Sequence, residues 1–294
     1  MKTYNIACIP GDGIGKEVVP AGQTVLEALA AAQNTFRFAF SAFDWGGDYY
    51  RQHGVMMPAD GLDALRDKDA ILFGSAGDPD IPDHITLWGL RLKICQGFDQ
   101  YANVRPTRIL PGIESPLRNC KREDLNWVIV RENSEGEYSG VGGRAHQGHP
   151  IEVATDVCMM TRVGVERIMR FAFRLAQSRP RKLLTVVTKS NAQRHAMVMW
   201  DEIALQISKE YPDVSWDKVL VDACTDRMVN RPASLDTLVA TNLAAKQLMQ
   251  AIESVTANPA LHTRDLGGKA TTREVTHAVC ALLTNNVQAQ RRAA

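Results

Sequence analysis

The sequence lacks an excess of charge of either sign. Its 34 Lys and Arg residues against 33 Asp and Glu residues leave a formal net charge of +1. A chain this balanced has no overall field to draw it to DNA, to RNA or to an anionic membrane. Any basic binding site must therefore be local.

Long hydrophobic runs are also missing. Apolar stretches such as residues 183–187 and 278–283 fall far short of the roughly 18 residues that a membrane-spanning helix needs. The first apolar segment, residues 6–9, is too brief for the core of a secretory signal and is followed by Pro-Gly-Asp. We therefore expect a cytoplasmic protein without a transmembrane segment.

The sequence has few cysteines, and their spacing excludes the common cysteine motifs. The six cysteines are scattered, with no C-x-x-C pair and no histidine nearby at zinc-binding spacing. Redox or zinc chemistry is therefore not expected, and buried free thiols are the better interpretation.

What the sequence does contain is an alternation of strand-like and helix-like patterns. Such an alternation indicates an α/β chain built on a largely parallel sheet, and 294 residues suffice for one large core or two smaller ones. No low-complexity linker separates two domains, so any second domain should be interwoven with the first. The predicted strands are residues 4–9, 36–43, 70–73, 127–130, 183–188, 219–221 and 235–240. The predicted helices are residues 17–33, 58–66, 162–177, 195–211, 245–255 and 274–283.

A glycine-rich turn at residues 10–15 joins the first predicted strand to the first helix. Its three glycines permit a tight turn and close approach of a ligand to the backbone. Both familiar nucleotide motifs are incomplete, because a dinucleotide fingerprint needs glycine where Lys16 stands and a P-loop needs Gly-Lys-Ser/Thr. Taken by itself, the turn favours a structural role.

Four arginines lie in segments that should end near loops: Arg91, Arg105, Arg108 and Arg131. A guanidinium group there is either a solvated charge or one arm of a fork that binds a carboxylate. Several such arms would suit a dicarboxylic acid.

Three further candidates follow strands or lie in polar loops. Tyr138 stands in a glycine-punctuated loop after Arg131, and Lys189 closes a predicted strand where it could serve as a base. Asp222 follows another strand, where a carboxylate either caps a helix or binds a hard metal ion. A single carboxylate does not hold Mg²⁺ or Mn²⁺ tightly, and a surface lysine is the commoner case.

Taken together, these segments resemble the β-decarboxylating dehydrogenases, which include isocitrate, isopropylmalate, D-malate and tartrate dehydrogenases. Residues 9–15, 103–106, 131–138 and 188–191 carry the marks of that family in its order. Residues 43–50, 84–91 and 99–101 look like its tartrate and D-malate branch. The resemblance runs from Tyr4 to about Asn242 and resumes near Lys246.

The resemblance implies two interwoven lobes around a largely parallel sheet, as in isocitrate and isopropylmalate dehydrogenases. Residues 1–100 together with 245–294 would form a cofactor-side lobe, and residues 101–244 a lobe for substrate binding and dimerisation. The implied reaction is oxidation of D-malate or tartrate by NAD, with loss of CO₂ from malate and help from Mn²⁺ or Mg²⁺. The implied assembly is a homodimer.

The resemblance also implies a role for each candidate residue. Arg91, Arg105 and Arg131 would bind the substrate carboxylates, with Lys189 as the base for the hydroxyl proton and Tyr138 as the acid that protonates the enolate carbon. Asp222 would bind the metal ion, and Lys189 and Asp222 would enter the partner subunit's site. The residues implied near the nicotinamide end of the cofactor are Gly74, Ser75, Ala76 and Asn191.

The sequence departs from the family after Leu243. There the family continues with a segment whose two aspartates complete the metal site, whereas this chain continues with Ala244, Ala245 and Lys246. The later family loop that holds the adenosine half of NAD is also absent. Either a stretch of the natural chain is absent from this sequence, or a true deletion leaves an impaired relative that still binds dicarboxylates. Replacement by other residues, such as Asp226, is the least favoured explanation.

Overall fold

The computed structural model describes residues 1–110, 120–242 and 244–245. Apart from Ala245, the predicted helices at residues 245–255 and 274–283 lie outside this range. The described chain divides into two compact units, the first comprising Met1–Gly97 and the second beginning at Phe98. The predicted lobe boundary after residue 100 and the interweaving of the lobes remain predictions.

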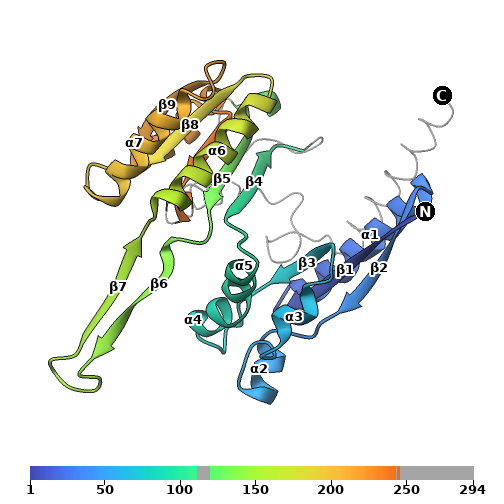
Figure 1. The fold of residues 1–294 in the computed structure, drawn as a ribbon. Coiled ribbons are helices and arrows are strands. Elements are labelled where there is room, and N and C mark those ends of the chain that lie inside the picture. The colour runs from blue at the N-terminus through green and yellow to red at the C-terminus, as the bar shows by residue number, and fades with distance from the viewer. Residues whose placement is uncertain (111–119, 243, 246–294) are drawn as a thin grey trace. The chain divides into compact units, whose positions relative to one another are not determined.

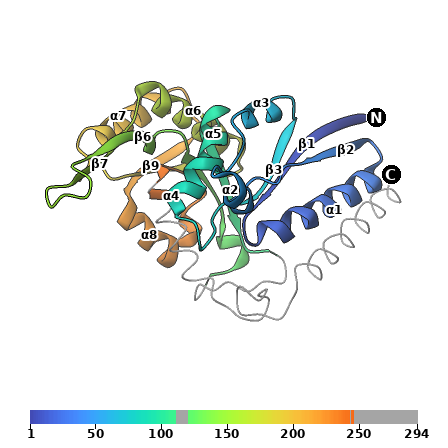
Figure 2. The same cartoon turned by 90° about the horizontal axis from the view of Figure 1, so that it is seen from below.

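The first unit is built on a parallel three-stranded sheet in the order β2-β1-β3. Strand β1 (Lys2–Gly11) lies between β2 (Phe36–Ala42) and β3 (Ala70–Ser75). Helix α1 (Gly15–Gln33) follows β1 and runs beside the three strands (Figures 1 and 2). The buried apolar side chains of this core include Ile6 and Val19.

Short helices complete the first unit. They are α2 (Gly47–His53), α3 (Gly61–Leu65), α4 (Asp83–Thr86), a π-helical turn η1 (Leu87–Leu92) and α5 (Lys93–Gly97). The structure therefore corrects the expectation for Arg91, which lies within a helical turn and not beside a loop. Leu90 and Leu92, the neighbours of Arg91 in this turn, are fully buried.

The second unit contains a five-stranded sheet in the order β4-β5-β10-β8-β9. Four of its strands are parallel, and β4 (Ala102–Arg108) pairs antiparallel with β5 at one edge. The parallel strands are β5 (Asn126–Glu132), β8 (Leu183–Thr188), β9 (Ser215–Leu220) and β10 (Thr237–Ala240). Short 3₁₀ turns lie at η2 (Arg122–Asp124) and η3 (Pro232–Ser234).

Helices cover both faces of this sheet. Successive strand residues alternate between two cores, as the two-residue period of a strand requires. Val130 and Val186 face α6 (Arg162–Ser178) and α7 (Ala196–Ser208). Ile129 and Val187 face α8 (Val221–Asn230). Burial on both faces explains why the predicted strands read as continuous apolar runs.

A two-stranded antiparallel ribbon, β6 (Gly136–Ala145) with β7 (Val153–Met159), extends from the second unit (Figure 1). The predicted strands did not include this ribbon or β4, because glycine and polar residues interrupt their apolar pattern. The strand predicted at residues 219–221 is β9 in the structure. It begins earlier, at Ser215, and ends at Leu220 because Val221 is the first residue of α8. The mixed α/β class with parallel sheets is confirmed.

Within the described residues, no helix combines the length and the apolar character needed to cross a membrane.

Candidate functional site

The predicted site residues fall into two groups, one in each unit, and each group is described by itself. The first unit holds Gly74, Ser75, Ala76 and Arg91, and the second holds Arg105, Arg131, Tyr138, Lys189, Asn191 and Asp222.

In the second unit, three predicted residues come together at the carboxyl edge of the parallel strands. Arg131 lies near the end of β5, Lys189 directly follows β8, and Asp222 follows β9. Because these strands are parallel members of one sheet, their carboxyl ends share an edge. Ligands of α/β proteins usually bind at such an edge.

Lys189 and Asp222 form an ion pair at this edge. The Lys189 ammonium donates to Asp222 Oδ2, and the two side chains are 35% and 70% exposed. Asp222 lies in the first turn of α8, where a carboxylate also interacts favourably with the helix dipole. Since exposed ion pairs contribute little to stability, both groups remain available to a ligand.

Arg131 and Tyr138 also come together. The Arg131 guanidinium carbon lies 5.6 Å from the centroid of the Tyr138 ring, although a turn separates the two residues in the chain. Arg131 is a residue of β5 and only 5% exposed, which corrects the expectation that it follows the strand. A buried guanidinium group needs compensating interactions, and such a group is suited to binding a carboxylate that is itself shielded from water.

Arg105 lies on the same face of the sheet as Arg131. In the antiparallel pairing of β4 with β5, Asn103 stands opposite Arg131, and Arg105 has the same orientation as Asn103. Its Nε donates to Asn103 Oδ1 at 3.2 Å. Arg105 lies within the strand and not near a loop, which corrects the sequence expectation. Asn191 is exposed in the turn after β8.

In the first unit, the glycine turn packs directly against Gly74 and Ser75, the last two residues of β3, which extends two residues beyond the predicted strand. The Asp12 N–H donates to the Ser75 carbonyl at 2.8 Å, and Ser75 Oγ donates to the Asp12 carbonyl at 2.5 Å. A Cβ on Gly74 would lie 2.2 Å from the Pro10 carbonyl, so this contact requires glycine.

Asp12 is a residue whose role the sequence reasoning missed. Its side chain is buried and accepts hydrogen bonds from Gly47 N–H at 2.5 Å and from Gly77 N–H at 2.9 Å. The carboxylate therefore joins the glycine turn to two other loops. The available signal was an acidic residue between two glycines directly after a strand, since a short acidic side chain in a turn often binds backbone N–H groups.

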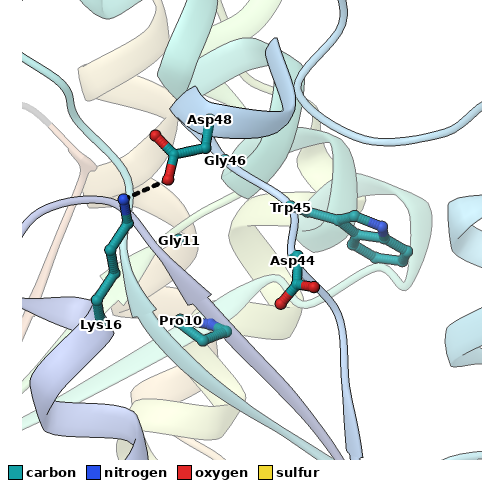
Figure 3. A pocket seen from close by; sticks show the side chains of 7 residues that line it. All are labelled: Pro10, Gly11, Lys16, Asp44, Trp45, Gly46 and Asp48. Atoms are coloured by element: carbon teal, nitrogen blue, oxygen red, sulfur yellow. Dashed lines mark hydrogen bonds and ion pairs between the residues drawn. The ribbon is translucent and has the colours of Figure 1, made fainter. Parts of the chain in front are cut away.

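A pocket of about 240 Å³ lies beside the glycine turn (Figure 3). Lys16 Nζ and Asp48 Oδ2 form an ion pair at 2.5 Å across it, and the Lys16 ammonium lowers the pKa of the Asp48 carboxyl below its usual value. The pocket is lined by Pro10, Gly11, Lys16, Asp44, Trp45, Gly46 and Asp48.

The described residues offer no complete metal site. No group of three His, Cys, Asp or Glu side chains in this part of the chain could hold a metal ion. Asp226, one turn after Asp222 on α8, accepts a hydrogen bond from Asn230 Nδ2 at 2.6 Å.

The five described cysteines are free thiols, as expected. Cys8 and Cys224 are buried, whereas Cys95, Cys120 and Cys158 are partly exposed, so the expectation of burial is correct for only part of the set. Burial raises the pKa of the Cys224 thiol to about 12. Cys280 lies outside the described residues.

The sequence profile described as isocitrate/isopropylmalate dehydrogenase matches residues 5–244. The match ends where the sequence departs from the family pattern, and residues from Ala245 onward lie outside it. A protein of Agrobacterium vitis named probable tartrate dehydrogenase/decarboxylase is 70% identical over 245 residues, which cover 83% of this chain and 68% of the relative.

Two more distant proteins extend this comparison. The D-malate dehydrogenase (decarboxylating) of Escherichia coli strain K12 is 49% identical over 245 residues, with the same shares of 83% and 68% covered. The crystal structure of isocitrate dehydrogenase from Methylococcus capsulatus matches with a TM-score of 0.75 and 31% identity, covering 87% of this chain and 71% of that one.

Proposed function

Because this chain belongs to the isocitrate/isopropylmalate dehydrogenase family, we propose that it oxidises a small 2-hydroxy dicarboxylate such as D-malate or tartrate with NAD, releasing CO₂ when the substrate is malate. The names of its relatives support this substrate class. The carrying observation is the meeting of Arg131 with Tyr138. Lys189 and Asp222 pair at the carboxyl edge of the same sheet and, in the proposed dimer, enter the partner subunit's site. We place this enzyme in the cytoplasm, in keeping with its free thiols.

The arginines supply substrate binding in this proposal. Arg105 and Arg131 share a sheet face, so their guanidinium groups can bind carboxylate oxygens of one small molecule. Arg91 is the third carboxylate-binding arginine of the proposal, as the family resemblance implies. Two or three guanidinium groups match the two carboxylates that D-malate and tartrate have in common.

Lys189 and Tyr138 supply the proton transfers. After it has released its own proton, the Lys189 Nζ amine takes the proton from the substrate hydroxyl as the C–H bond at the same carbon breaks. After CO₂ leaves, Tyr138 Oη gives a proton to the enolate carbon. The contact of Arg131 with the Tyr138 ring supports this arrangement, because it brings a carboxylate-binding group next to the proposed acid.

NAD, when bound, accepts the hydride. The first unit has a backbone suited to it: at Gly13 and Gly77 nothing lies within 4 Å of the position that a Cβ would take, so a ligand can approach the main chain. Gly74 and Ser75 end β3 and Ala76 follows them, and we propose these three residues and Asn191 as contacts for the cofactor.

Mn²⁺ or Mg²⁺ is part of the proposal, but the described residues do not fit it by themselves. Asp222 provides one carboxylate, and these ions need several oxygen ligands. We therefore derive no step from the metal ion.

The assembly we propose is a homodimer that uses the β6–β7 ribbon. On one face of the ribbon, Val141 stands opposite Val157, with Val153 and Met159 on the same face of β7. These side chains are exposed within the chain. A two-stranded ribbon is marginal by itself in water, so a second copy covering this face would stabilise it.

The alternative proposal is an impaired relative that binds dicarboxylates without oxidising them. The departure from the family pattern after Leu243, where the resemblance implies the two further metal-binding aspartates, favours it. The two proposals differ in their response to Mn²⁺, which should tighten substrate binding and support turnover only in the enzyme.

The test is NADH formation from D-malate and from tartrate, with NAD and Mn²⁺, by the purified chain and by Lys189→Ala. We expect loss of the base to reduce turnover by about a hundredfold or more while substrate binding persists. Lys182→Ala is the matched control, because Lys182 precedes the same strand and pairs with Asp213 at 2.7 Å.

Undiminished turnover in Lys189→Ala would contradict the role of this lysine. If the unaltered chain binds either acid in calorimetry but forms no NADH with Mn²⁺ present, the alternative proposal holds. The intact mass of the natural protein is a separate measurement. A mass above 32.5 kDa would show that the natural chain contains residues that this sequence lacks, such as the family segment expected after Leu243.

A further inference from the structure

An arginine on α6 reaches the turn that connects β5 to β6. Arg167 Nη2 donates to Ser134 Oγ at 2.8 Å. Arg167 Nη1 donates to both carboxylate oxygens of Asp99, at 2.9 and 2.8 Å, and the guanidinium carbon lies 4.6 Å from the centroid of the Tyr101 ring. A guanidinium group held on several sides in this way has a fixed orientation.

Ser134 connects Arg167 to the buried carboxylate of Glu132 by hydrogen bonds. Glu132 is 3% exposed, and its Oε1 accepts from Ser134 Oγ at 2.7 Å and from Ser134 N–H at 3.0 Å. Its Oε2 accepts from Glu135 N–H at 2.9 Å. A buried carboxylate is costly unless its oxygens are satisfied, so the turn must keep the conformation that supplies these donors.

The same turn controls the position of Tyr138. Tyr138 N–H donates to the Glu135 carbonyl at 3.3 Å, and the Glu135 carboxylate accepts from Thr161 N–H at 2.8 Å and from Thr161 Oγ1 at 2.6 Å. Thr161 is the N-cap residue, directly before the first residue of α6. The turn from Arg131 to Tyr138 is thus attached to α6 at two places, through Arg167 and through Thr161.

We propose that Arg167 is a positioning residue, which sets the relative geometry of Arg131 and Tyr138 by holding Ser134 and, through it, Glu132. This inference rests on the proposed function of Arg131 and Tyr138. Arg167 itself contacts Ser134, Asp99 and Tyr101. Its effect is to keep the carboxylate-binding arginine and the proton donor at a fixed separation, which matters because small misplacements of reacting groups are costly in rate.

The kinetic test compares Arg167→Met with Arg167→Lys. We expect Arg167→Met to lower kcat by about ten- to a hundredfold, while KM for NAD changes less than about twofold, because the cofactor loop belongs to the other unit. Arg167→Lys retains a donor for Ser134 and should recover part of kcat.

Arg170→Met is the matched control. Arg170 lies on the same helix one turn later and pairs with Glu166 at 3.2 Å and Glu210 at 2.9 Å, not with the turn. Its kcat should stay within about twofold of the unaltered chain. An equal loss of kcat in Arg167→Met and Arg170→Met would overturn the inference, because it would show general damage to α6.

Hydrogen exchange tests the inference without turnover. In Arg167→Met, amides in a peptide spanning residues 133–138 should exchange faster, whereas in Arg170→Met they should not, and Ser134→Ala should have the same effect as Arg167→Met. Unchanged exchange in Arg167→Met would overturn the inference. If the unaltered chain forms no NADH from either acid, the proposed function fails, and the exchange result still decides whether Arg167 holds the turn.

Discussion

At the residue scale, two glycines of the glycine turn, Gly11 and Gly13, are needed for different reasons. Gly11 and Gly13 both have positive φ values, +67° and +49°. A Cβ on Gly11 would lie 2.0 Å from the Ser75 carbonyl oxygen, whereas a Cβ on Gly13 would meet nothing within 4 Å. Gly11 is therefore fixed by packing as well as by backbone conformation, while Gly13 leaves the backbone open to a ligand.

We predict that Gly11→Ala destabilises the first unit by about 2 kcal/mol or more, since strain and a backbone clash combine. Gly13→Ala should cost about 1 kcal/mol, because only the left-handed conformation opposes it. Urea unfolding followed by circular dichroism measures both. Equal losses in the two variants would contradict the close packing of Gly11 against Ser75.

At the element scale, α6 organises the second unit. Its apolar face packs against the sheet, its N-cap residue Thr161 binds the Glu135 carboxylate, and Arg167 reaches the turn before Tyr138. The helical pattern in the sequence predicted the buried face of α6 because spacing specifies which residues share a face. It did not predict the polar contacts, because these depend on which loop lies at the start of the helix.

We predict that Thr161→Ala destabilises the chain by about 1 kcal/mol, because Thr161 Oγ1 accepts from Gly164 N–H at 3.0 Å as the helix cap. Thr161→Ser keeps the hydroxyl and should lose less than about half as much. Thermal unfolding of the two variants measures the difference. A loss in Thr161→Ser as large as that in Thr161→Ala would show that the methyl group, not the cap, is responsible.

At the scale of the whole molecule, the β6–β7 ribbon has an apolar face that is exposed in the single chain. Val141 and Val157 form one exposed apolar face, while Arg144 and Asp156 lie on the other. An apolar face of this kind is stable when another surface covers it. A two-fold homodimer covers it with the same face of a second copy, since such interfaces are self-complementary.

We predict that Val157→Lys converts the dimer to a monomer, because it buries a charge in the proposed interface. Ala154→Lys, on the opposite face of the same strand, should leave the dimer intact. Sedimentation velocity distinguishes these states. A monomeric unaltered chain, or equal dissociation by both variants, would contradict the proposed use of this face.

The sequence by itself determined the elements whose side chains repeat with a regular period. Helices α1, α6 and α7 were predictable because burial of one face imposes a helical period on the residues, and the parallel strands of the second unit because burial on both faces gives continuous apolar runs. The family was also readable, because the marks at residues 9–15, 103–106, 131–138 and 188–191 are local segments of sequence.

Tertiary structure decided which of these residues meet. The pairing of Lys189 with Asp222, the contact of Arg131 with Tyr138 and the bonds from Asp12 to Gly47 and Gly77 join segments far apart or separated by a turn. Local pattern specifies which face a residue occupies but not which strand is its neighbour. Strand order and loop packing settle that, since they depend on the free energy of the whole core.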